Sequence, residues 1–180
     1  MNICVYGAAS DNIDSEYFRA AESLGEQIAA RGHGLVFGGG ATGLMGAVAR
    51  GVTIGGGYIL GIAPKFFDKP GVLYERCTEF IYPKDMRARK ELLEGRSQAT
   101  IVLPGGIGTY EEFIEILTLK SLGQIDRPVV LYNIKGYYDE MIRLLEHTAD
   151  AGFMNENVIG MFNLCDDADE IIEYIEKYYD

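Results

Sequence analysis

A glycine-rich segment followed by two adjacent glutamates is the part of this sequence whose residue types best suit chemistry. Residues 104–112 read Pro-Gly-Gly-Ile-Gly-Thr-Tyr-Glu-Glu and follow Thr100–Leu103, an apolar run that is typical of a buried strand. Glycines let backbone N–H groups approach an anion closely, and the positive end of a following helix adds to the attraction. The segment therefore predicts a phosphate site with the carboxylates of Glu111 and Glu112 beside it.

Thr109 and Glu112 also fit a purely structural role, because they have the spacing of a capping box. In that motif the threonine is the N-cap of a helix, and the glutamate three residues later returns a hydrogen bond to it. Acidic residues favour helix N-termini for electrostatic reasons as well. From this segment by itself we favour the capping interpretation, so a catalytic Glu112 needs support from elsewhere in the chain.

That support comes from Met86-Arg87-Ala88-Arg89-Lys90, the most basic cluster in an acidic chain. It falls near the start of the helix that feeds the strand before the glycine segment. Arg89 and Lys90 are candidates for neutralising a phosphate, or one of them for pairing with a catalytic carboxylate and keeping it ionised. A solvated basic face is the alternative, and we prefer it for Arg87.

The elements that must position these residues follow from the alternation of short apolar runs with longer amphipathic ones. Strands are expected at Ile3–Tyr6, Leu35–Phe37, Tyr58–Ile62, Glu79–Tyr82, Thr100–Leu103, Val129–Tyr132 and Met161–Leu164. Helices are expected at about 14–31, 42–55, 84–97, 109–122, 137–150 and 167–179. The alternation predicts a three-layer, Rossmann-like α/β fold with about seven mainly parallel strands between helices. We expect residues 1–180 to form one domain.

Three of the expected strand-to-helix junctions are rich in small residues: Gly7–Ser10, Gly38–Gly43 and Pro104–Thr109. In such folds ligands bind beyond the carboxyl ends of the strands. Each junction alone is weak evidence, since tight turns use glycine for steric reasons. Three of them on one edge of a sheet favour a phosphate-bearing ligand.

Other nucleotide sites fit the sequence less well. Gly38, Gly40 and Gly43 match GxGxxG, but a dinucleotide site also needs an acid after the next strand, and none occurs before Asp68. The chain has no GK[ST] sequence for a P-loop and no Gly-x-Ser-x-Gly elbow for a serine hydrolase. A mononucleotide or a sugar phosphate remains.

The amino-acid composition and net charge limit the classes of partner that this chain can bind. With 16 basic and 27 acidic residues, the formal net charge is −11, which disfavours nucleic acid and anionic membranes as partners. No apolar run is long enough to cross a bilayer, and we expect a cytoplasmic protein. The three cysteines, Cys4, Cys77 and Cys165, are expected to be buried reduced thiols. Two histidines supply no convincing metal site, so no metal is expected.

Together these residues resemble the Lonely Guy family, the cytokinin-activating phosphoribohydrolases, whose older members were often labelled lysine decarboxylases. The family's PGGxGTxxE motif corresponds to Pro104–Glu112, and its Met-x-x-Arg-Lys element corresponds to Met86–Lys90. The Gly-Gly-Gly-x-x-Gly-Leu-Met-Gly element corresponds to Gly38–Gly46. The likeness extends from the first strand to the last helix, with the elements in the same order and at near-identical spacing.

The resemblance implies hydrolysis of the N-glycosidic bond of a purine nucleoside 5′-monophosphate, giving a free base and ribose 5-phosphate. The implied substrate is N6-prenyl-AMP or AMP, for cytokinin activation or nucleotide salvage. Arg89 and Glu112 are the implied catalytic pair, with an ionised Glu112 stabilising positive charge on the ribose or activating water, by loose analogy with glycoside hydrolysis. A homodimer with its site near the subunit contact is also implied, and no cofactor is expected.

Further residues are implied to surround the substrate. They are Ala9, Gly40, Met86, Lys90, Gly105, Gly106, Ile107, Gly108, Thr109, Tyr110, Glu111 and Thr118. The chain departs from many relatives at Gly7-Ala8-Ala9-Ser10, where they have Cys-Gly-Ser-Ser, and at Gly71, where several have a glutamate. Base recognition is therefore open. Phe66, Phe67, Leu73 and Tyr74 are candidates for lining a pocket for the N6 substituent, with core packing as the alternative for some of them.

The alternative function is a non-catalytic nucleotide-binding or carrier module of the same fold, because fold alone does not fix function. A pure binder has no reason to require Arg89 and Glu112 together. We reject the decarboxylase label, because nothing in the sequence resembles a pyridoxal phosphate lysine in its usual setting.

Overall fold

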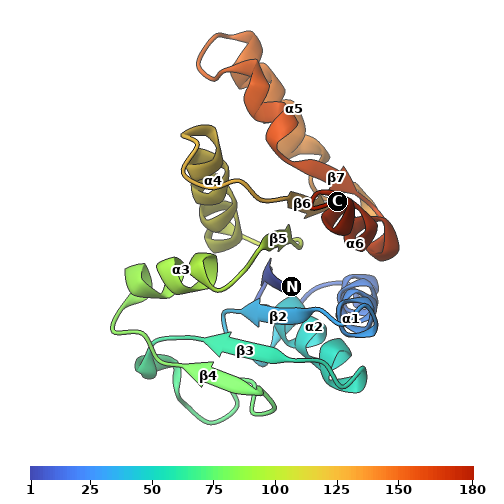
Figure 1. The fold of residues 1–180 in the computed structure, drawn as a ribbon, viewed down its shortest axis with the longest axis vertical. Coiled ribbons are helices and arrows are strands. Elements are labelled where there is room, and N and C mark those ends of the chain that lie inside the picture. Colours follow the sequence, from blue (N-terminus) through green and yellow to red (C-terminus); the bar gives the residue numbers. More distant parts are fainter.

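The computed structural model describes residues 1–180 and contains one sheet of seven strands in the order β4-β3-β2-β1-β5-β6-β7 (Figure 1). All six neighbouring pairs are parallel, so the predicted parallel α/β sheet is confirmed. The strands are β1 Asn2–Tyr6, β2 Gly34–Phe37, β3 Ile59–Ile62, β4 Glu79–Ile81, β5 Ala99–Val102, β6 Val129–Tyr132 and β7 Asn163–Cys165.

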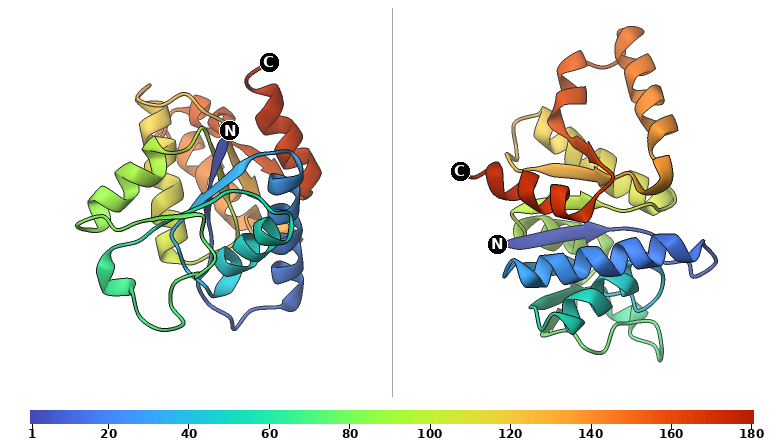
Figure 2. Two further views of the ribbon diagram at one scale, coloured as in Figure 1. Left: turned by 60° about the horizontal axis from the view of Figure 1, so that its bottom comes forward. Right: turned by 90° about the vertical axis from the view of Figure 1, so that its right-hand side faces the viewer.

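Helices cover both faces of this sheet, which gives the expected three layers (Figures 1 and 2). Helices α1, α2 and α6 pack on one face, and α3, α4 and α5 contribute to the core on the other. The helices are α1 Ser15–Ala30, α2 Gly43–Ile54, α3 Met86–Gly95, α4 Ile107–Ser121, α5 Asp139–Asp150 and α6 Ala168–Lys177. Three short 3₁₀ turns are η1 Lys65–Phe67, η2 Ile134–Gly136 and η3 Glu156–Met161.

The central strands are apolar throughout because both of their faces are buried. In β1, Ile3 and Val5 pack into the core beneath α1, α2 and α6, whereas Cys4 and Tyr6 pack into the opposite core. Strand periodicity therefore sends alternate residues to two separate cores. This explains why the sequence shows continuous apolar runs instead of alternation.

The position of the site follows from the strand order. The chain adds β2, β3 and β4 on one side of β1, and β5, β6 and β7 on the other. The connections after β1 and β5 therefore diverge to opposite faces, which opens a crevice at the carboxyl ends of these two strands. The N–H of Ala8 donates to the carbonyl of Pro104 over 3.0 Å, so the first and third glycine junctions meet there.

Some predicted boundaries differ from the structure. The seventh strand was expected at Met161–Leu164, but it begins at Asn163, because Met161 still belongs to the turn η3. Helix α4 begins at Ile107, two residues before its expected start.

Cys4, Cys77 and Cys165 are free thiols, as expected, but Cys77 is only partly buried. In this fold, every helix falls short of the length and apolar character that crossing a membrane requires.

One buried hydroxyl in the sheet has no hydrogen-bond partner, which leads to a prediction about stability. The side chain of Thr100, in β5, is buried and its hydroxyl has no hydrogen-bond partner. A buried polar group left without a partner costs roughly 1–3 kcal/mol. Because valine has nearly the same shape, we expect Thr100→Val to raise the free energy of unfolding by about 1 kcal/mol, as measured by urea denaturation.

Thr53 provides the matched control for this substitution. Its hydroxyl lies 2.8 Å from the carbonyl oxygen of Ala49 and 2.7 Å from the hydroxyl of Tyr74. Thr53→Val removes both hydrogen bonds and is expected to lower stability. Destabilisation by Thr100→Val as well would show that the Thr100 hydroxyl is satisfied in the folded protein.

Candidate active site

The glycine segment enters α4 differently from a capping box. The N-cap of α4 is Gly106, and no side chain caps the helix. Thr109 is the third residue of the helix and is buried, and Glu112 lies in the second turn. The capping interpretation was therefore wrong. The physical reason is packing, because the Thr109 side chain turns back against Gly105, where an added Cβ would lie 2.1 Å from the Thr109 hydroxyl.

The N-terminus of α4 consequently keeps free hydrogen-bond donors. The first intrahelical bond runs from the N–H of Tyr110 to the carbonyl of Gly106, and the N–H groups of residues 107–109 have no acceptor within the chain. Helices α1, α3 and α6 are capped instead by aspartate side chains. At α2 the N–H of Gly43 is bound by Asp11 at 2.8 Å. Of the three glycine junctions, the one before α4 therefore best suits an anion.

No contact within the chain requires glycine at positions 106 and 108. An added Cβ would meet no atom within 4 Å at either position, and neither residue has a positive φ. Gly108 lies inside α4, where glycine costs about 1 kcal/mol relative to alanine. Both residues line the same pocket, so their lack of a side chain leaves room in it.

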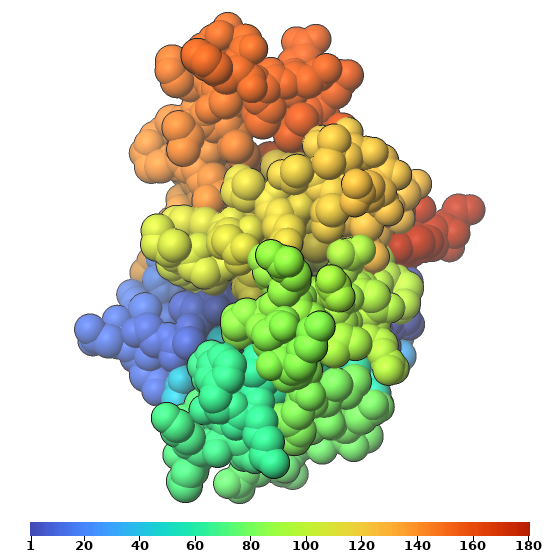
Figure 3. All heavy atoms as spheres, turned by 90° about the vertical axis from the view of Figure 1, so that its left-hand side faces the viewer, coloured from blue at the N-terminus to red at the C-terminus, as the bar shows by residue number.

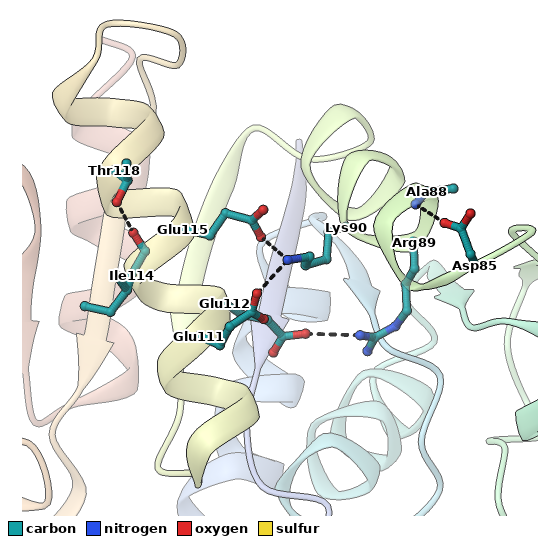
Figure 4. A network of polar contacts seen from close by, with 9 residues as sticks. All are labelled: Asp85, Ala88, Arg89, Lys90, Glu111, Glu112, Ile114, Glu115 and Thr118. Atoms are coloured by element: carbon teal, nitrogen blue, oxygen red, sulfur yellow. Dashed lines mark hydrogen bonds and ion pairs between the residues drawn. The ribbon is translucent and has the colours of Figure 1, made fainter.

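Arg89 and Glu112 form a nearly buried ion pair across the pocket (Figure 4). Arg89 Nη1 lies 3.2 Å from Glu112 Oε1, and the exposed fractions of the two side chains are 11% and 13%. Arg89 Nε also donates to the carbonyl of Ile62, at the end of β3, over 3.2 Å. The guanidinium fits because Gly38 has no side chain, since a Cβ there would lie 2.1 Å from Arg89 Nη2. The pairing of an arginine with the candidate carboxylate is as expected.

The ionisation of Glu112 is set by two opposing effects. Burial raises the pKa of its carboxyl from 4.5 to about 7, and the charge of Arg89 and its hydrogen bond only partly oppose this rise. We had expected the ion pair to keep the carboxylate ionised. Instead, burial outweighs the pair, and Glu112 exchanges its proton near neutral pH.

The ion pair lies in a pocket of about 430 Å³ at the carboxyl edge of the sheet. Figure 3 views the face where the segment around Phe67 (teal), α3 (green) and α4 (yellow) meet. Predicted residues that line the pocket are Ala9, Gly40, Arg89, Gly106, Gly108, Thr109 and Glu112. The structure therefore brings together all three glycine junctions and both candidate catalytic residues.

One wall of the pocket is apolar and was predicted only in part. Phe67 and Leu73 line it, as proposed, together with Met45 and Val72, which the sequence reasoning missed. Phe66 is exposed outside the lining. Tyr74 packs against the core and bonds to Thr53. Met45 could have been predicted, because it lies within the Gly38–Gly46 element. No sequence feature pointed to Val72.

The segment that carries Val72 and Leu73 is attached to the second glycine junction by its backbone. Residues Gly40 and Leu73 form an isolated antiparallel bridge. On either side of it, the N–H of Ala41 donates to Val72 over 2.9 Å, and the N–H of Tyr74 donates to Gly39 over 2.8 Å. The glycine junction and the apolar wall are thus parts of one backbone arrangement.

The remaining predicted residues lie outside the pocket lining. Lys90 binds Glu111 at 2.6 Å and Glu115 at 3.0 Å beside it (Figure 4). The Thr118 hydroxyl donates to Ile114 further along α4. The others are Met86 and Ile107, both exposed, Gly105, which is buried, and Tyr110, whose hydroxyl contacts Tyr137.

Comparison of sequences relates this chain to one family. The family model described as "Possible lysine decarboxylase" matches residues 45–175. A probable cytokinin riboside 5′-monophosphate phosphoribohydrolase from Oryza sativa subsp. japonica is 35% identical over 97% of this chain and 83% of its own length. A cytokinin riboside 5′-monophosphate phosphoribohydrolase from Arabidopsis thaliana is 36% identical over 98% of this chain and 82% of its own length.

Among solved structures, the fold is similar to that of two proteins of another kind. The Moco carrier protein from Chlamydomonas reinhardtii has a TM-score of 0.75 at 24% identity, over 99% of this chain and 96% of that one. The molybdenum cofactor binding protein from Rippkaea orientalis has a TM-score of 0.74 at 20% identity, over 99% and 97%. At these identities the likeness concerns the fold alone.

Gly108 allows the open helix N-terminus to be tested. Alanine at this position suits the helix and would raise stability by up to about 1 kcal/mol, but its Cβ would enter the pocket. We expect Gly108→Ala to fold normally and to weaken the binding of inorganic phosphate at least tenfold, measured by calorimetry. Gly95, an exposed helical glycine at the end of α3 with equally open surroundings, is the control, and Gly95→Ala should bind phosphate normally. Equal affinities for the two variants would place the anion elsewhere.

The raised pKa of Glu112 makes stability depend on pH. The folded protein holds the Glu112 proton more tightly than the unfolded chain does, so stability is expected to fall as pH rises from 4.5 to about 7. Since each pKa unit is worth about 1.4 kcal/mol, the loss is on the order of 3 kcal/mol. Glu112→Gln should lack it. The measurement is the difference in unfolding free energy between the two proteins from pH 4.5 to 8, and a constant difference would contradict the raised pKa.

Proposed function

Because the chain belongs to the Lonely Guy family of phosphoribohydrolases, we propose that it hydrolyses the N-glycosidic bond of purine nucleoside 5′-monophosphates. The products are a free base and ribose 5-phosphate. The observation that carries the proposal is the buried pair of Arg89 and Glu112 beside an uncapped helix N-terminus. Such a site combines a place for a phosphate with a carboxylate able to act on the attached sugar.

The phosphate would bind at the start of α4. The N–H groups of residues 107–109 are free to donate, and the helix contributes the equivalent of about half a positive charge at this end. The side-chain-free surfaces of Gly106 and Gly108 let phosphate oxygens reach these donors. Binding by backbone groups also suits a chain whose net charge is −11.

Glu112 lies one turn beyond these donors on the same helix and faces the same pocket. With the phosphate held at residues 106–109, the ribose would extend toward its carboxylate. Cleavage builds positive charge on the ribose as the base leaves, and an ionised Glu112 stabilises that charge or takes a proton from the attacking water. A carboxyl with a pKa of about 7 is well suited to exchanging a proton at neutral pH.

Arg89 holds this carboxylate in place. Its guanidinium contacts Glu112 and the carbonyl of Ile62, so the acid is oriented from α3 while it is presented by α4. Removing Arg89 would leave a buried carboxylate without a partner, which favours its protonated form. We therefore assign Arg89 the role of keeping part of the Glu112 population ionised.

The base would lie against the apolar wall formed by Met45, Phe67, Val72 and Leu73. A flat apolar base, with or without an apolar N6 substituent, suits this lining. N6-prenyl-AMP and AMP are both proposed substrates, for cytokinin activation or for nucleotide salvage.

We also propose a homodimer with the site near the subunit contact, and one domain spanning residues 1–180. Ile107 and Ile114 of α4 and its C-cap residue Leu122 are exposed, and their spacing places them on one side of the helix. Thr118 falls on this same face by its spacing. An apolar helix face beside the pocket supports the proposal that a second copy covers it.

A carrier function is the second candidate, favoured by the similarity in fold to the two molybdenum cofactor proteins. Binding a ligand without cleaving it gives no reason to bury a carboxylate whose pKa lies near neutral pH. The decarboxylase description is disfavoured by Lys90, which lies beside the pair and binds Glu111 and Glu115. Its pKa is raised by hydrogen bonds to Glu111 and Glu115, whereas a Schiff-base lysine must lose its proton.

The proposed reaction is tested by incubating the protein with a panel of purine and pyrimidine 5′-monophosphates and following base release by chromatography. We expect release from AMP or N6-prenyl-AMP, and a loss of about 100-fold or more in Glu112→Gln. Glu115→Gln, one turn further along α4, removes an exposed carboxylate and should keep a near-normal rate. Tight binding of a nucleotide that is recovered unchanged would support the carrier instead.

A further inference from the structure

Groups from outside the glycine segment fix its backbone. The carbonyls of residues 103–105 each accept one hydrogen bond from outside the segment. The Tyr138 hydroxyl donates to the first over 2.6 Å, the N–H of Ala8 to the second over 3.0 Å, and the Tyr137 hydroxyl to the third over 2.6 Å. The peptide planes leading to the phosphate donors are therefore held by the junction that follows β1 and by the connection between β6 and α5.

The hydroxyls of Tyr110 and Tyr137 form a chain with a defined direction. They lie 3.0 Å apart. A phenol has one proton to donate, and Tyr137 donates its proton to the carbonyl of Gly105. Tyr110 must therefore be the donor to Tyr137. Since Tyr110 belongs to α4, the helix and the peptide before it are joined through Tyr137.

The orientation of the Gly105 carbonyl decides where the next donor points. Residues 105 and 106 share a planar trans peptide, because the structure has no cis bond. In such a peptide the C=O and the following N–H point in opposite directions. With its carbonyl turned to Tyr137, this peptide directs the N–H of Gly106 away from the tyrosine. Gly106 lies between two hollows. It lines the pocket that holds Arg89 and Glu112, and it also lines the neighbouring hollow that contains Tyr137 and Ile13.

Tyr137 is itself held firmly. Lys135, two residues earlier, has φ of 58°, and is the only non-glycine residue with positive φ. Its ammonium lies 3.0 Å from Asp14 and 2.7 Å from Glu16, which ties this unusual turn to α1. The Tyr137 ring packs edge-on against Tyr17, with centroids 6.3 Å apart. A left-handed conformation costs a lysine free energy, and it is retained where the surroundings require it.

We propose that Tyr137, supported by Tyr110, is a positioning residue for phosphate recognition. It orients the peptide between Gly105 and Gly106 so that the N–H of Gly106 joins the donors of the first turn of α4. This inference rests on the proposed function for the phosphate site and extends it to a residue outside the glycine motif. Tyr137 contacts neither sugar nor base in this role, so it affects substrate binding and leaves the chemical step unchanged.

Tyr137→Phe tests the proposal, since it keeps the ring contacts and removes the hydroxyl. Loss of one orienting hydrogen bond is expected to weaken binding of inorganic phosphate about 5- to 10-fold, measured by calorimetry. In turnover of AMP or N6-prenyl-AMP, KM should rise by a similar factor with kcat nearly unchanged. Tyr110→Phe should produce a smaller effect in the same direction.

Tyr179→Phe is the matched control, because its hydroxyl also donates to a backbone carbonyl, that of Gln98, far from the pocket. It should leave phosphate affinity and KM at wild-type values. Unchanged phosphate affinity in Tyr137→Phe, or a fall in kcat without a rise in KM, would overturn the proposal. If no nucleotide is cleaved but Tyr137→Phe still weakens phosphate binding, the proposed reaction fails and the positioning role stands. Wild-type protein that binds no inorganic phosphate would overturn the positioning role, whereas base release from the nucleotides decides the proposed reaction separately.

Discussion

The burial of the Glu112 carboxylate is the constraint to which the other parts of the site respond. A buried carboxylate is costly without a partner, so a cation must reach it from another element, and Arg89 of α3 does so. The guanidinium needs a further acceptor, which the carbonyl at the end of β3 supplies, and space, which Gly38 supplies. The burial of Glu112 thus accounts for Arg89, for glycine at position 38 and for the placement of α3 beside α4.

The start of α4 lacks the stabilising contacts that a helix N-terminus usually has, because no side chain caps it. Helices α1, α3 and α6 have aspartate caps, but α4 begins at a glycine with three free donors. Sequence reasoning preferred the stabilising option, a capping box with Thr109. The structure instead tucks Thr109 against Gly105. Local stability is given up where an anion can restore it, and the tyrosines behind the segment hold the unliganded backbone in place.

The sequence was sufficient for the parts of the molecule that depend on periodicity and strand order. Both-sided burial made β1 and β5 visible as apolar runs, and the parallel order then required their glycine junctions to meet. The spacing of the two motifs also predicted that an arginine would pair with the candidate carboxylate, and Arg89 does pair with Glu112. The roles of Val72 and Tyr137 were not predicted, because both residues lie in connections far from the motifs in sequence. The pattern of apolar residues around them gives no sign that they lie beside the site. The raised pKa of Glu112 could not be foreseen either, because the depth of its burial depends on packing between α3 and α4.

The attachment of the apolar wall has a consequence for how such proteins diversify. The wall is joined to the glycine junction by backbone hydrogen bonds between residues 39–41 and 72–74, and these do not depend on which side chains the wall carries. The side chains of Val72 and Leu73 can therefore be exchanged while the uncapped start of α4 and the ion pair keep their positions. If a base lies against this wall, as proposed, mutation of this one segment would change the preferred base without disturbing the rest of the site.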